Sequence, residues 1–137
     1  GRTTVNNDIL GHWYSLLFAR EIVLINREIC THIVSSGGAN LTNQHSRVRM
    51  QLFDALEETY DMLEAHPHMR IRYSHHFWSL SIRVMRWARG RISDDLRTEF
   101  DLFFKNLMMR MDLHDYARIR MKRSPDLSDD IVKSLLM

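Results

Sequence analysis

The fold is decided by residues 43–90, which read NQHSRVRMQLFDALEETYDMLEAHPHMRIRYSHHFWSLSIRVMRWARG. Apolar residues recur in the first half every three or four positions, the period of one face of a helix. This spacing predicts a helix from about Asn43 to Ala65, stopped by Pro67, because proline disfavours the helical conformation of the residue before it. The inward face is Leu52, Phe53, Leu56, Tyr60 and Leu63, and the outward face is an acidic stripe of Asp54, Glu57, Glu58, Asp61 and Glu64.

The second half of this stretch predicts the next helix, from about Met69 to Arg89. Gly90 follows it as a stop signal. With only a few residues between the two helices, we expect neighbours in a helical hairpin.

Upstream, the sequence predicts an unusually long helix from Asn7 or Asp8 to about Ser35, with Gly37 and Gly38 ending it. Its apolar residues cover three sides and leave only a narrow polar strip. A helix that is apolar nearly all round is normally buried. Such a helix lies either at the centre of the domain or in an oligomer interface, and we favour the centre of the domain.

Downstream, Ser93 or Asp94 is expected to cap a fourth helix, which continues or restarts through His114 to Arg123. A break at Ser124–Pro125 leads into a last helix over 126–137. No segment alternates convincingly at period two with turn residues on both sides, so strands are not expected. The prediction is an all-α fold: a single antiparallel bundle of about five helices packed around the N-terminal helix, with residues 1–137 as one helical domain of a longer protein.

The composition is that of an ordinary globular domain. The chain has 137 residues, 45% of them apolar and 26% charged, which is enough for one core but not for two. A net charge of +2 means that attraction to a polyanion would depend on local clusters. The single cysteine, Cys30, excludes an intrachain disulfide framework and fits a reducing compartment, so we expect an intracellular protein of the nucleus or cytoplasm. The most apolar run, 22–25, is too short to span a bilayer, and no membrane partner is expected.

Arginine dominates the basic residues, with sixteen arginines against three lysines. At 100° per residue, one face of the helix at 69–89 carries Arg72, His76, Ser79, Arg83 and Arg86. A planar guanidinium suits bidentate contacts with carboxylates or phosphates. Three interpretations remain open: pairing with the acidic stripe of the preceding helix, docking of an acidic protein segment, or contact with nucleic-acid phosphates. On the opposite side we expect Phe77, Leu80, Val84, Trp87 and Ala88 to face the core.

Two further surfaces are candidates for binding. Leu102 and Met109 stand two turns apart on the otherwise polar side of the fourth helix and predict a continuous apolar ridge. Such a ridge would pack against another element of the domain, against a second copy of the chain or against a helix of a partner protein. A basic cluster near the end of the chain consists of Arg118, Arg120, Lys122 and Arg123. It suggests a nucleic-acid-binding patch, although nearby aspartates favour a charged face that only contacts solvent.

Catalytic and metal-binding patterns are weak. The eight histidines form no HExxH motif, and the adjacent pair His75–His76 would project about 100° apart on a helix, a poor chelate. No phosphate-binding loop or nucleophile motif occurs. We therefore expect no metal, no cofactor and no enzyme activity. The prediction is a docking, scaffold or oligomerisation module of a larger intracellular regulatory protein. Its partner would be a protein or peptide with acidic and apolar residues, or a second copy; the alternative is an RNA- or DNA-binding domain using the arginine face.

Overall fold

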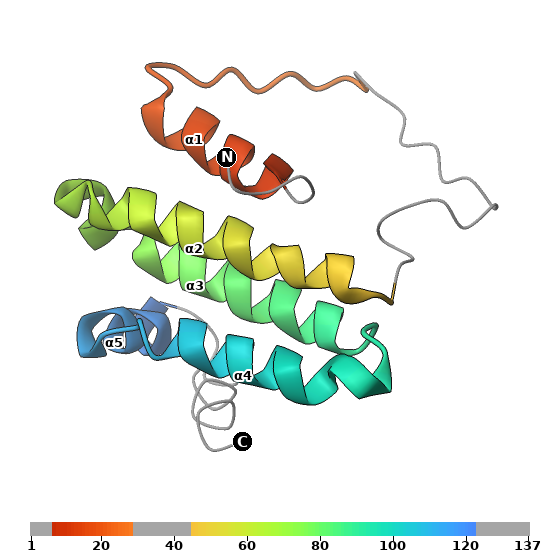
Figure 1. Ribbon diagram of the computed structural model, residues 1–137. Coiled ribbons are helices and arrows are strands. Elements are labelled where there is room, and N and C mark those ends of the chain that lie inside the picture. The colour runs from red at the N-terminus through yellow and green to blue at the C-terminus, as the bar shows by residue number, and fades with distance from the viewer. Residues whose placement is uncertain (1–6, 29–44, 123–137) are drawn as a thin grey trace.

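The computed structural model describes residues 7–28 and 45–122 of the chain, and all regular structure within them is helical (Figure 1). The predicted all-α class with about five helices is confirmed. The α-helices are α1 (Asn7–Phe18), α2 (Gln51–Glu64), α3 (Pro67–Arg89), α4 (Arg97–Met108) and α5 (Leu113–Lys122). Two short 3₁₀ turns, η2 (Arg47–Met50) and η3 (Asp94–Leu96), lead into α2 and α4.

The hairpin of α2 and α3 follows the sequence signals closely. α2 ends at Glu64, and Pro67 occupies the first turn of α3, where its missing N–H has no helical partner to lose. The chain reverses direction here and again after Gly90, so that α2, α3 and α4 lie side by side (Figure 1). The η2 turn replaces the start of the helix predicted from Asn43, a residue outside the described ranges.

The core is centred on α3, which contacts α2, α4 and α5. Its largest fully buried side chain is Trp78, whose ring lies 4.8 Å from that of Tyr60 on α2. The rings of Phe53 on α2 and Phe100 on α4 are also 4.8 Å apart, in an edge-to-face arrangement. Such aromatic pairs contribute about 0.5–1.5 kcal/mol beyond the area that they bury. Packing of these rings fixes the relative positions of α2, α3 and α4.

The prediction of a long, central N-terminal helix is wrong. α1 ends at Phe18, and residues 19–28 leave it as non-helical chain. Three of its apolar side chains, Tyr14, Leu16 and Phe18, are exposed, and only Ile9, Trp13 and Leu17 pack against the core. Continuing the helix would require a turn through β-branched residues of 22–25, which lose side-chain freedom in a helix. The aromatic core is formed by α2, α3 and α4, and no other described element covers a second apolar face of α1.

Other predicted boundaries lie partly outside the described residues. The helix expected to continue from α4 restarts as α5 at Leu113. The stop at Gly37–Gly38, Arg123 and the helix predicted over 126–137 fall outside the described ranges.

Candidate functional site

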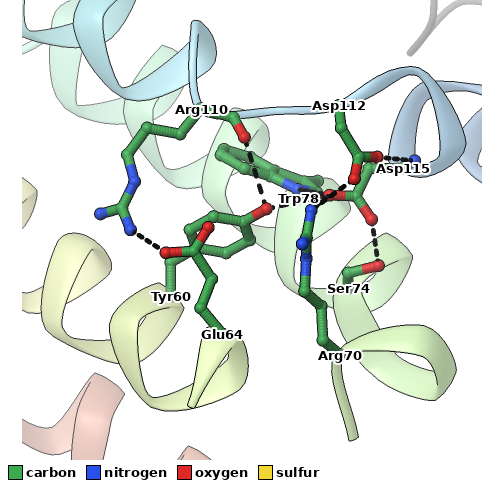
Figure 2. A network of polar contacts seen from close by, with 8 residues as sticks. All are labelled: Tyr60, Glu64, Arg70, Ser74, Trp78, Arg110, Asp112 and Asp115. Carbon is green, nitrogen blue, oxygen red and sulfur yellow. Dashed lines mark hydrogen bonds and ion pairs between the residues drawn. The ribbon is translucent and has the colours of Figure 1, made fainter. Parts of the chain in front are cut away.

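A buried carboxylate lies where α2, α3 and α5 meet (Figure 2). Asp115 on α5 is only 3% exposed. Its Oδ2 accepts hydrogen bonds of 3.0 Å from the hydroxyl of Tyr60 and of 3.0 Å from the indole Nε1 of Trp78. Its Oδ1 accepts a hydrogen bond from the hydroxyl of Ser74, and the guanidinium of Arg70 lies 3.5 Å from Oδ2. Both carboxylate oxygens are therefore satisfied, as a buried charge requires.

The start of α5 positions this carboxylate. Asp112, just before the helix, accepts a 2.7 Å hydrogen bond from the backbone N–H of Asp115, the geometry of an N-cap. Arg70 pairs with Asp112 as well, with an N–O distance of 2.5 Å. Burial alone would raise the pKa of Asp112, but the backbone hydrogen bond and the charge of Arg70 outweigh it, so the pKa lies below its ordinary value of 3.8.

Tyr60 is held between two guanidinium groups. Arg70 lies 5.7 Å and Arg110 lies 4.8 Å from the centre of its ring, in cation–π geometry. Burial raises the pKa of the Tyr60 phenol above its ordinary value of 10.0, and the negative charge of Asp115 raises it further. Arg110 also pairs with Asp61 at 2.7 Å and Glu64 at 2.6 Å. The outward carboxylates at the end of α2 are thus paired with an arginine that follows α4, a partner that the sequence did not predict.

The contacts of this network join α2, α3 and α5. The carboxylate of Asp115 has four donors around it and is almost fully buried. Among the described residues, no group of three or more histidine, cysteine, aspartate or glutamate side chains is placed to hold a metal ion. A cleft of about 340 Å³ opens beside the network and includes Arg118 of the predicted basic cluster. Arg70 and Asp112, which also line the cleft, are already paired with each other.

A second hollow is apolar and lies between α1 and α3. Its volume is about 560 Å³. Trp13 and Leu16 line it from α1, and Leu80 and Val84 line it from α3. The rings of Trp13 and Phe77 meet in an edge-to-face arrangement at 5.9 Å between centres, which joins α1 to α3, although α1 packs mainly on α2. The remaining lining residues are Ile9, His12, Leu17, Ile22, Tyr73 and His76.

The predicted arginine face borders this α1–α3 groove. Arg72 and Arg83 are exposed, and the guanidinium of Arg72 lies 5.4 Å from the ring of Tyr73 on the groove wall. Neither arginine forms an ion pair with another described residue. His76 lines the groove itself, whereas Arg86 is exposed and has an interaction within the chain. His76 therefore lines the groove, Arg72 contacts the wall residue Tyr73, and Arg83 is exposed beside the lining residue Val84 in the sequence of α3.

Part of the predicted face of α3 is wrong. Ser79, assigned to the arginine face, is 4% exposed, whereas Leu80 and Trp87, assigned to the core, are 40% and 42% exposed. The helix is rotated about its axis relative to the prediction, because its most buried positions centre on Trp78 and Met85. Trp87 instead contacts Arg49 and Arg91, whose guanidinium carbons lie 4.9 Å and 4.5 Å from its ring.

The two other predicted surfaces, the apolar ridge and the basic cluster, lie on helices other than α3. Leu102 and Met109 are 57% and 69% exposed, so no described element buries the ridge that they form. Arg120 and Lys122 are exposed on α5, on a different helix from Arg72 and Arg83.

No membrane-crossing segment is found among the described helices, none of which combines sufficient length with sufficient apolar character. Comparison of the chain with protein families, curated proteins and solved structures finds no match. Its function must therefore be inferred from the groove, the network and the exposed charges.

Sequence reasoning missed the buried network. The pair Asp112 and Asp115, three residues apart at the start of a helix, carried a recognisable capping signal. Buried tyrosine and tryptophan also require partners for their polar atoms. What the sequence lacked was any indication of which partner, since Tyr60 and Trp78 stand 55 and 37 positions from Asp115.

Proposed function

We propose that this domain is a non-catalytic protein-interaction module that binds an amphipathic helix of another protein in the α1–α3 groove. The observation that carries the proposal is an open apolar groove with two arginines along one edge, neither in an ion pair with another described residue. In this proposal, the domain serves as a docking or scaffold module of a larger intracellular regulatory protein.

The groove has the features of a helix-binding site. Its volume of about 560 Å³ falls in the range of ligand pockets, and it is lined mostly by apolar and aromatic side chains. Leu16 and Leu80 remain 59% and 40% exposed on its two walls, so apolar area is available to be buried by a partner. A helix in such a groove would insert residues spaced at i, i+3, i+4 and i+7.

Charge favours an acidic partner. α3 contains five arginines and no carboxylate over Pro67–Arg89. Two of the five are committed internally, Arg70 to Asp112 and Asp115, and Arg89 to Asp101 at 2.6 Å. Arg72 and Arg83 flank the groove and would orient carboxylates on the rim of the bound helix. Rim pairs of this kind affect association rate and register more than affinity.

A pair of designed peptides tests the proposal by fluorescence anisotropy. The probe is a labelled amphipathic helix with leucine along one face and glutamate beside it, and its match carries lysine in place of glutamate. We expect the glutamate peptide to bind better, and Leu80→Glu to abolish binding by placing a charge in the apolar wall. Arg83→Glu should weaken the glutamate peptide and strengthen the lysine peptide. Arg120→Glu, the same charge change on α5, is the matched control and should change neither.

The results also separate the nucleic-acid alternative. If a labelled oligonucleotide binds and both Arg83→Glu and Arg120→Glu weaken it, while the glutamate peptide does not bind, the groove proposal is overturned in favour of polyanion binding. Steep loss of oligonucleotide affinity with salt would mark that outcome.

A further inference from the structure

The chain that leaves α1 has an unusual exposed apolar segment. Residues 20–28, REIVLINRE, follow the end of the helix and run as an extended chain above α1 in Figure 1. Their four central side chains are strongly exposed: Ile22 57%, Val23 72%, Leu24 92% and Ile25 57%. Aliphatic and β-branched residues of this kind are typical of strands, not of exposed connecting chain.

The backbone of this segment has no pairing partner within the described ranges 7–28 and 45–122. No peptide group of residues 20–27 forms a backbone hydrogen bond with another described residue. An extended chain with unpaired N–H and C=O groups and apolar side chains is a template for another strand. The partner that fits is defined by the charged residues at the two ends of the segment.

Those charges are complementary to a second copy of the same segment in one antiparallel register. When Leu24 faces Leu24 of the second copy, Arg20 faces Glu28 and Glu21 faces Arg27. Each contact occurs twice by symmetry, as in any isologous interface. Opposite charges directly across an antiparallel pair stabilise it.

Neighbouring registers bring like charges together. A shift by one residue in one direction places Arg20 opposite Arg27, and a shift in the other direction places Glu21 opposite Glu28. In a parallel, in-register stack, each charged residue would face the same residue of the neighbouring chain. Like charges directly opposite are destabilising, so the segment selects against slipped pairs and against extended parallel stacking.

We propose that residues 20–28 are a self-association site at which two copies of the chain pair as antiparallel strands centred on Leu24. This proposal goes beyond the peptide-binding function proposed for the groove, and the two surfaces share one residue, Ile22, which also lines the groove. Asn26 and Arg27 bend in the single chain, and Glu28 has an interaction within its own chain, so pairing straightens this end and exchanges that interaction for a contact with Arg20 of the second copy. Because isolated two-stranded pairs are marginal in water, we expect a weak dimer that forms with increasing concentration.

Register-specific crosslinking is the sharpest test. In a Cys30→Ser background, Leu24→Cys places two thiols directly opposite each other, within disulfide reach. Ile22→Cys is the matched control, because its two thiols would lie about 14 Å apart along the strands at about 3.4 Å per residue. We expect a covalent dimer under mild oxidation from Leu24→Cys and not from Ile22→Cys. Equal crosslinking of both variants, or of neither, would overturn the proposed register.

A charge exchange provides an independent test by sedimentation velocity over a concentration series. Arg20→Glu alone should raise the dimer dissociation constant about tenfold, because two pairs change from opposite to like charge. Glu28→Arg alone should do the same, and the two together should restore dimerisation. Both side chains are exposed, so unchanged circular dichroism and melting temperature will show that the fold is intact. A wild-type monomer at every concentration, or the absence of rescue in the double variant, would refute the strand pairing.

Discussion

The hydroxyl of Tyr60 on α2 donates a 3.0 Å hydrogen bond to the carboxylate of Asp115 on α5, and both residues are fully or almost fully buried. This contact closes a buried polar network between α2, α3 and α5. Networks of this kind fix one arrangement of helices when every member is satisfied, and they are costly when one member is removed. The α5 helix therefore depends on α2 and α3 for its position.

Removal of the Tyr60 hydroxyl should destabilise the protein while leaving the aromatic packing in place. We expect Tyr60→Phe to lower the free energy of unfolding by about 1–3 kcal/mol, because a hydrogen bond to a buried charged group is lost. Urea denaturation followed by circular dichroism measures the change. Tyr73→Phe is the matched control, since the Tyr73 ring is half-buried on the groove wall, and its effect should be under about 0.5 kcal/mol. Equal effects of the two substitutions would contradict a special role for Tyr60.

The same tyrosine should resist ionisation. Because burial raises the pKa of Tyr60 in the folded state, its phenol stays protonated where exposed tyrosines ionise. A raised pKa contributes stability that is present below the unfolded value of about 10 and is lost as pH rises above it. In a spectrophotometric titration we expect one of the four tyrosines to ionise only with alkaline unfolding. Tyr60→Phe should remove that delayed step, and a complete, reversible titration of all four in the folded wild type would argue against it.

The lowered pKa of Asp112 predicts a loss of stability at acid pH, whereas the raised pKa of Tyr60 predicts a loss at alkaline pH. Its pKa is lowered in the folded state, so its contribution to stability is present above 3.8 and is lost as pH falls through the lower folded value. Asp112→Asn keeps an N-cap side chain but removes the charge. The variant should therefore be less stable than wild type near neutral pH and should lose less stability on acidification, as urea midpoints across this range will measure. A constant difference between the two proteins at all pH values would show that the charge of Asp112 does not matter.

The sequence predicted local features of this fold better than its long-range packing. Pro67 and Gly90 marked the ends of α2 and α3 because the restricted backbone of proline and the low helix propensity of glycine act locally. The predicted buried side of α3 was rotated relative to the observed one. Leu80 and Trp87 are as apolar as core residues, and only the packing of the neighbouring helices determines that Trp78 is buried and these two are exposed. The length of α1 was overestimated for a related reason: an apolar sequence indicates burial only where another element covers it.

For the candidate sites, too, local features could be predicted from the sequence and long-range contacts could not. Arg72 and Arg83 were predicted to share an exposed face, and they do, because helical geometry alone places them there. The apolar groove beside them required the position of α1, which packs mainly on α2 and meets α3 at the contact of Trp13 with Phe77. The Asp115 network required pairing across three helices, and nothing in the spacing of Tyr60, Ser74 and Asp115 indicated it.

The apolar ridge on α4 provides a final test of which surface mediates self-association. Leu102 and Met109 are exposed, so the double change Leu102→Glu with Met109→Glu should alter the free energy of unfolding by no more than about 0.5 kcal/mol. If two chains pair through residues 20–28, the double variant should also still form a concentration-dependent dimer, which light scattering will measure. Leu24→Glu, a matched charge insertion at an exposed leucine, should abolish that dimer, because it sets two carboxylates against each other at the centre of the strand pair. Loss of the dimer in the α4 variant with retention in Leu24→Glu would assign self-association to the ridge instead.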